Sequence, residues 1–298
     1  MARRRRWSLT KAASWTFSVV ALAGIAGLAA LFAVQSLPVW KHAGWGFLTG
    51  REWFFRESLF GAAPMIYGTL VVAAVALALA APVGIGAAVF TSEFLPRRWR
   101  LAVKLAIELL AGVPSVVYGL LGILLLRNWV YDALEPFEPL SGDTLLTAGV
   151  LLAVMLLPTV MTLAEDALRG VPGAQRAAAR GLGLTATETV LHVTLPQAAP
   201  GILAAVLLSL GRALGEMIAV FLVVGRQDNQ WPAPVHSVRP LLEAGQTLSS
   251  KLGGAEINIA YGDPLHWAAM AGLALVLLLL VTTLTLLGAR LRRTDHAT

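Results

Sequence analysis

Cysteine is absent from the sequence, and its absence excludes disulfide bonds, thiol catalysis and thiolate metal sites. Charged residues are scarce: they make up 13% of the 298 residues, whereas 57% of the residues are hydrophobic. Because the hydrophobic residues form blocks long enough to cross a bilayer, the composition argues against a soluble domain. It predicts an all-α integral membrane protein.

The signatures of several enzyme classes are also missing. No lysine follows a glycine, so the Gly-Lys step of a P-loop is absent and the chain is expected to have no ATP site of its own. Neither HExxH nor GxSxG occurs, and His42, His236, His266 and His296 are scattered through loops and the tail. We therefore expect no catalytic residue, metal site or cofactor in this chain.

Six apolar blocks have about the 20 residues that a helix needs to cross a bilayer. They lie at 15–37, 67–91, 105–126, 145–164, 199–225 and 267–289. The run Arg3–Arg6 before the first block resembles a secretory signal, but this block is longer than the apolar region of a cleaved signal. We expect a basic N-terminus over 1–14, a transmembrane domain over 15–290 and a tail over 291–298.

The distribution of lysine and arginine predicts the orientation. Fifteen of these 23 residues lie in the two termini and in the segments 92–104 and 165–198, whereas seven lie in the alternate segments 38–66, 127–144 and 226–266. The positive-inside rule therefore places both termini in the cytoplasm. The net charge of +6 then reflects topology and contact with anionic lipid, since no polar domain is large enough to hold a nucleic acid.

The three alternate segments have the composition of a membrane surface. Residues 38–66 are rich in Trp and Phe, residues 127–144 carry acidic residues around two prolines, and residues 226–266 are rich in Pro, Gly, Asn and Gln. Two interpretations remain open: interfacial caps, or a landing surface for an extracytoplasmic partner.

The segment 165–198 has a local design of its own. Residues 173–180 are Ala-rich and favour a helix that begins after Pro172. Glycines at 181 and 183 then break this helix, and Thr185 with Glu188 has the spacing of a capping box. A second short helix is expected to follow and to end at Pro196. Two short helices joined by a glycine elbow would form a compact knob below the membrane.

This segment resembles the "EAA" loop of ABC importer permeases, from the spacing of Gly183 to Leu195-Pro196 after an Ala-rich helix. In that family the loop is a coupling helix that docks in a groove of the cytoplasmic ATPase. The resemblance implies coupling roles for Arg169, Ala177, Ala178, Gly183, Thr185, Glu188, Leu195 and Pro196. Ala177 stands where the motif has Glu, so Arg176 or Arg180 is the alternative polar contact.

A wider resemblance is carried by GAAPMIYGTL at 61–70, ELLAGVPSVVYGL at 108–120 and LGRALGEMIAV at 210–220. These stretches are similar to the PstC-type permease subunits of phosphate-specific ABC importers, across most of 60–290. The resemblance implies a type I bundle of six helices in the bacterial inner membrane. It also implies a PstA-type sister permease, an ATPase dimer that binds ATP and Mg²⁺, and an extracytoplasmic phosphate-binding protein.

Two charges fall inside the fifth block. Arg212 and Glu216 are four residues apart, which predicts one helix face, and a charge at this depth should face protein or water. Either the two neutralise each other as a structural pair, or Arg212 offers its guanidinium to a passing oxyanion. The resemblance favours the second interpretation. In the third block, Glu108 is a weaker candidate for the substrate pathway.

Pro114 and Ser115 also belong to the predicted pathway, because a proline at membrane depth breaks the helix. Such broken backbone is tolerated where it is buried in protein or faces a wet cavity. The leading hypothesis is half of the membrane path of a phosphate importer. The alternatives are another oxyanion (molybdate, tungstate or sulfate), or a proton-coupled transporter that uses Glu216 or Glu108.

Overall fold

The computed structural model describes residues 9–231 and 239–294, and the basic run Arg3–Arg6, His236 and His296 lie outside this part. The α-helices are α1 (Leu9–Ala43), α2 (Gly46–Thr49), α3 (Ala63–Val89), α4 (Arg97–Ala111), α5 (Ser115–Leu121), α6 (Arg127–Leu134), α7 (Leu145–Gly170), α8 (Gly173–Gly181), α9 (Ala186–Thr189), α10 (Leu195–Leu214), α11 (Ile218–Val223), α12 (Leu248–Leu252), α13 (Glu256–Ala260) and α14 (Pro264–Thr294). Short π-helical segments are η2 (Phe90–Phe94), η3 (Gly122–Leu126) and η5 (Val190–Thr194).

The remaining regular elements are small and lie between the helices. The 3-10 turns are η1 (Phe55–Glu57), η4 (Glu135–Phe137) and η6 (Arg239–Leu242). The strands β1 (Trp53–Phe54) and β2 (Leu59–Phe60) pair antiparallel, with Trp53 opposite Phe60.

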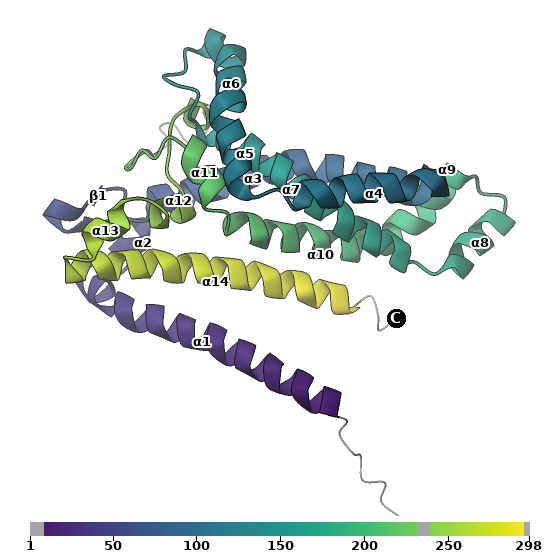
Figure 1. Ribbon diagram of the computed structural model, residues 1–298, viewed down its shortest axis with the longest axis horizontal. Coiled ribbons are helices and arrows are strands. Elements are labelled where there is room, and N and C mark those ends of the chain that lie inside the picture. Colours follow the sequence, from purple (N-terminus) through teal and green to yellow (C-terminus); the bar gives the residue numbers. More distant parts are fainter. Residues whose placement is uncertain (1–8, 232–238, 295–298) are drawn as a thin grey trace, which may run out of the picture.

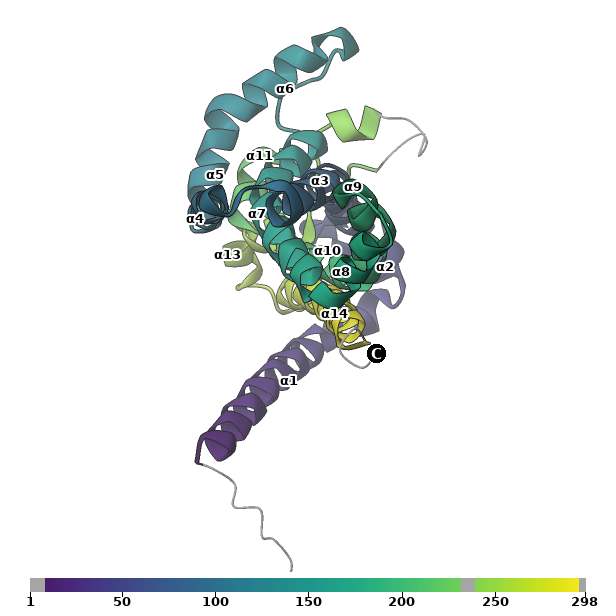
Figure 2. The ribbon, with the colours of Figure 1, turned by 90° about the vertical axis from the view of Figure 1, so that its right-hand side faces the viewer.

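Six helices in the described part are long and apolar enough to cross a membrane, which confirms the predicted number of spans. They are Thr10–Ala43, Ala63–Phe94, Ser115–Phe137, Leu145–Gly170, Ala186–Leu214 and Pro264–Arg290. The helices α3, α7, α10 and α14 run in a similar direction in Figure 1 and are viewed nearly end-on in Figure 2. In contrast, α1 slants away from them and residues 10–28 of α1 are exposed.

The core of the bundle lies between α3 and α7. Its buried residues are small or aliphatic and include Val72, Ala76 and Ala80 of α3 together with Leu151 and Leu152 of α7. At Gly149 of α7, a Cβ atom would lie 2.5 Å from Cγ1 of Val75, so only glycine allows this approach of the two helices. Small residues play this part in membrane bundles because lipid provides no hydrophobic force between helices.

The two ends of the bundle differ. The start of α1, the end of α14 and the pair α8–α9 lie toward one end, whereas β1, α12 and α13 lie at the other (Figure 1). The described start of α1, the end of α14 and the pair α8–α9, which the sequence predicts on one side of the membrane, therefore lie at the same end of the bundle.

The third span differs from the prediction of one helix over 105–126. Helix α4 ends at Ala111, Pro114 has an extended ψ of 139°, and the spanning helix begins at Ser115 and turns across the direction of the bundle (Figures 1 and 2). The cause is local, because Pro114 has no N–H and disfavours a helical residue before it. The hydroxyl of Tyr118 donates a hydrogen bond to the carbonyl of Leu110 across the break, at 2.8 Å.

The fifth span also differs from the prediction of a helix over 199–225. It begins at Ala186, passes through η5 into α10 and ends at Leu214, and α11 starts only at Ile218. The expectation that Pro196 ends a helix is wrong. Pro196 lies in the first turn of α10, where a missing N–H is tolerated because the preceding turn η5 is π-helical.

Candidate functional site

The knob predicted from the sequence is present as α8, a glycine elbow and α9, which we call the α8–α9 loop (residues 171–189). Gly183 has φ +93°, a left-handed conformation that favours glycine. The capping box forms as predicted: the Thr185 hydroxyl accepts from the N–H of Glu188, and the Glu188 carboxylate accepts from the N–H of Thr185 at 2.8 Å. The loop protrudes past α7 and α10 in Figure 1.

Most of the predicted coupling residues face outward. Ala177, Ala178, Gly183, Thr185 and Glu188 are exposed. The neighbouring side chain of Leu182 is 84% exposed, so the loop presents an apolar as well as a polar surface.

The remaining predicted coupling residues, and the alternatives Arg176 and Arg180, have the following environments. Arg169 forms an ion pair with Glu165 one turn earlier in α7, at 2.5 Å. Leu195 and Pro196 lie at the start of α10. Arg176 turns inward to Glu93, whereas Arg180 remains exposed.

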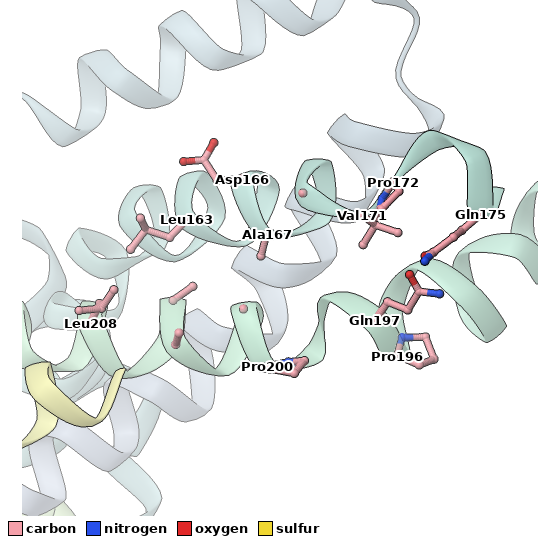
Figure 3. Close-up of a pocket in the computed structure, with 14 residues that line it drawn as sticks. Leu163, Asp166, Ala167, Val171, Pro172, Gln175, Pro196, Gln197, Pro200 and Leu208 are labelled. Carbon is pink, nitrogen blue, oxygen red and sulfur yellow. The ribbon is translucent and has the colours of Figure 1, made fainter. Parts of the chain in front are cut away.

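A cleft of about 580 Å³ separates α7 from α10 at the base of the α8–α9 loop. Asp166, Gln175 and Gln197 are among the polar residues that line it, together with Pro172 and Pro196. Figure 3 shows the side chains of Gln175 and Gln197 converging from α8 and α10. The base of the loop is therefore packed through Val171, whereas Gln175 of α8 borders the cleft.

Arg212 and Glu216 do not form the predicted pair on one helix face. Arg212 lies in the last turn of α10, where its Nη1 donates to Thr159 Oγ1 at 3.4 Å, and its side chain is exposed. Glu216 lies beyond the end of α10, and its Oε1 accepts from the N–H of Ala219 at 3.5 Å. Because the helix stops at Leu214, the i,i+4 relation that the prediction required is lost.

The breaks before α5 and after α10 lie close together, because α5 packs on α11. A Cβ atom on Gly119 would lie 2.5 Å from Cδ1 of Leu222, and one on Gly122 would lie 2.8 Å from Cγ1 of Val223. The later residue of α5 faces the later residue of α11, so the two helices run in the same direction and their starts lie at the same end. The structure thus brings the segment with Pro114 and Ser115 toward the segment that carries Glu216.

Glu108 lies on α4, outside the spanning helix. It pairs with Lys104 at 3.9 Å, and both side chains are about half exposed. This position is that of a surface pair on an amphipathic helix, which weakens the case for Glu108 in the pathway.

Sequence reasoning missed a cluster of buried charges at the opposite end of the bundle. Lys251 is 2% exposed, lies 2.6 Å from Asp228 and forms a second ion pair with Glu256. Trp53 Nε1 donates to Glu256 at 2.6 Å, and His266 Nε2 lies 2.8 Å from the same carboxylate oxygen. We call these five residues the Lys251 cluster. It joins β1, α12, α13, α14 and the loop after α11.

The pKa values of the two carboxylates in the Lys251 cluster are shifted in opposite directions. Burial raises the pKa of Asp228, and the ammonium of Lys251 only partly opposes this. Burial also raises the pKa of Glu256, but the hydrogen bond and charge of Lys251 outweigh it, with Trp53 and His266 adding hydrogen bonds, so the pKa is lowered. In the sequence, the one indication of this cluster is Lys251, a single lysine in a stretch of small residues.

An interrupted bundle with a protruding two-helix loop is the architecture of a transporter's membrane subunit. Residues 80–294 match the family described as "Binding-protein-dependent transport system inner membrane component". The chain therefore belongs to this family.

Curated relatives of the chain have phosphate transport names. The phosphate transport system permease protein PstC of Mesorhizobium japonicum is 33% identical, with 99% of this chain and 94% of that protein covered. PstC 1 of Mycobacterium tuberculosis is 36% identical, with 77% and 72% covered.

Among solved structures, the fold is similar to a chain of the MetNI methionine ABC transporter in an inward-facing conformation. The TM-score is 0.52 at 20% identity, covering 79% of this chain and 94% of that one. The likeness confirms the predicted permease fold of a type I ABC importer.

Proposed function

We propose that this chain forms half of the membrane pathway of an ATP-driven importer for inorganic phosphate. The names of the relatives support the substrate. The observation that carries the proposal is the exposed guanidinium of Arg212 at the point where the fifth span is interrupted. Interrupted helices are where transporters build substrate sites, because freed backbone groups can then face a wet path.

The chemistry of Arg212 suits a phosphate that must pass and leave. Its planar fork of donors matches two phosphate oxygens, and only one donor is used by Thr159. Glu216 lies four residues on, beyond the end of the helix, and its negative charge disfavours tight capture of an anion. Pro114 and Ser115 contribute the second interrupted segment of the pathway.

The other parts of the importer follow from the same assignment. A PstA-type sister permease supplies the second half of the path, and an extracytoplasmic phosphate-binding protein delivers the anion. A cytoplasmic ATPase dimer, which binds ATP and Mg²⁺, docks on the α8–α9 loop. The chain then spans the bacterial inner membrane with both termini in the cytoplasm, and its exposed apolar faces contact lipid and the sister subunit.

The test is uptake of labelled phosphate by the complete complex in proteoliposomes. ATP-dependent uptake that excess molybdate, tungstate or sulfate fails to compete supports the proposal. Equal competition would change the substrate to another oxyanion. Uptake that persists without ATP and collapses with the proton gradient would overturn the proposal in favour of proton coupling.

Arg212→Ala tests whether the exposed guanidinium of Arg212 belongs to the phosphate pathway. We expect uptake to be abolished while the variant still assembles with its partners, because the exposed side chain makes one weak contact inside the chain. Arg98→Ala, at an exposed position on α4, is the matched control and should transport normally. Normal uptake by Arg212→Ala would remove this residue from the pathway.

A further inference from the structure

The side chain of Arg176 connects the α8–α9 loop to two spanning helices at once. Its Nη1 lies 2.8 Å from Oε1 of Glu93, in the π-helical turn η2 that ends the α3 span. Its Nη2 donates to the backbone carbonyl of Leu168 near the end of α7, at 2.5 Å. One guanidinium therefore joins α8, α3 and α7.

Both charged groups of this bridge are shielded from water. The Glu93 side chain is 6% exposed and the Arg176 side chain is 21% exposed. By comparison, the nearby ion pair Arg169–Glu165 stays within α7, where the glutamate side chain is 6% exposed and the arginine side chain is 48% exposed. A charge-assisted hydrogen bond between two shielded groups is stronger and more directional than an ion pair at the surface.

Helix α8 has little else to hold it. Ala179 is its buried residue, and an alanine offers one methyl group for packing. On the side of α7 and α10, Val171 at the start of the loop packs with Leu168 and Ala198, whereas Gln175 of α8 borders the cleft of about 580 Å³. The polar bridge of Arg176 is thus the main side-chain connection between α8 and the bundle among the described contacts.

We propose that Arg176 and Glu93 are positioning residues that transmit movement of α8 to the α3 span, an inference that rests on the proposed function. Helix α3 packs along α7 through the core of the bundle, so a displacement of Glu93 shifts this whole helix pair. The other end of the α8–α9 loop continues without a break into α10. An ATPase that moves the loop would then act on α3 through Arg176 and on α10 through the chain.

The experiment compares phosphate transported per ATP hydrolysed in the complete reconstituted complex. The variants are Arg176→Ala, Glu93→Gln and the exchange Arg176→Glu with Glu93→Arg, and Arg98→Ala, at an exposed position on α4, is the control. We expect each single variant to assemble and to hydrolyse ATP, but to lose at least about fivefold in phosphate per ATP, the lower range of a typical coupling free energy. The exchange should recover most of this loss, and Arg98→Ala should keep the normal ratio.

A second measurement does not depend on the substrate. Because the chain has no cysteine, spin labels can be attached at Ala174→Cys and Phe94→Cys, both at exposed positions. In the otherwise unchanged complex, the distribution of distances between the two labels should stay narrow when ATP binds. With Arg176→Ala this distribution should broaden or its mean distance should shift.

The outcomes separate this inference from the proposed function. If the complex transports no phosphate, the proposed substrate is contradicted. If the label distances in that complex still stay narrow only when Arg176 is present, the bridge between Arg176 and Glu93 is supported. Normal phosphate per ATP in the single variants, an exchange variant no better than they are, or a label distance unaffected by Arg176→Ala would overturn the inference.

Discussion

Replacing Lys251 by methionine removes one buried positive charge from between two carboxylates. The ammonium of Lys251 lies 2.6 Å from Asp228 and pairs also with Glu256, and the side-chain exposures are 2%, 33% and 18%, respectively. Methionine has a similar length and apolar body, so the change acts mainly through the charge. The two carboxylates would then face each other without compensation.

The magnitude follows from the environment of each carboxylate. Removing one partner of a buried ion pair costs about 3–5 kcal/mol. Asp228 is accessible enough for water to solvate it in part, and Glu256 keeps its contacts with Trp53 and His266. We therefore expect the lower end, about 3 kcal/mol in the free energy of unfolding. At about 2–4 °C per kcal/mol, Tm should fall by roughly 6–12 °C.

The assay is thermal unfolding of the purified protein in lipid nanodiscs, followed by tryptophan fluorescence. Lys104→Met is the matched control, because the Lys104–Glu108 pair is exposed and 3.9 Å long. Such a pair contributes at most about 1 kcal/mol. Adding Asp228→Asn and Glu256→Gln to Lys251→Met should recover part of the loss, since no uncompensated charge remains. Equal shifts for Lys251→Met and Lys104→Met would refute the reasoning.

Three further predictions concern other parts of the chain. Gly183→Val should weaken co-purification of the ATPase, because φ +93° strains a β-branched residue at the elbow of the α8–α9 loop; unchanged recovery would contradict the coupling role. Tyr118→Phe should lower the free energy of unfolding by about 1 kcal/mol, because it removes the hydrogen bond across the break at Pro114; an unchanged Tm would show that this hydrogen bond does not stabilise the break. Glu256 has a lowered pKa when folded, so its stabilisation is present above the unfolded value of 4.5 and lost as the pH falls through the folded value. Asp228 has a raised pKa, so its contribution falls as the pH rises above 3.8; Asp228→Asn should therefore steepen the acid-side loss measured by Tm against pH.

The charge pair in the fifth span shows how far periodicity reaches. Spacing alone predicted Arg212 and Glu216 on one face, which holds only if a helix continues through both residues. The chain reads GRALGEM there, and the structure ends α10 at Leu214. Whether a glycine bends, ends or merely loosens a membrane helix depends on the neighbouring helices, here the packing of α5 on α11.

Pro114 and Pro196 also show that the same residue type can break a helix or be accommodated in one. The first lies in a break that divides α4 from α5, whereas the second begins α10 inside a longer helical segment. The local effect of proline is the same in both places, namely a missing N–H. The preceding π-helical turn η5 accommodates it at Pro196.

The sequence by itself determined the class of protein, the number of spans, the knob with its capping box, and the family resemblance. These features depend on hydrophobic block length and local hydrogen bonding, which a short stretch of residues already contains. Only the tertiary structure decided where the third and fifth spans break and which charges meet. Arg176 is 83 residues from Glu93, and Trp53 is 203 residues from Glu256. Contacts over such separations depend on how the helices pack, and no local pattern encodes them.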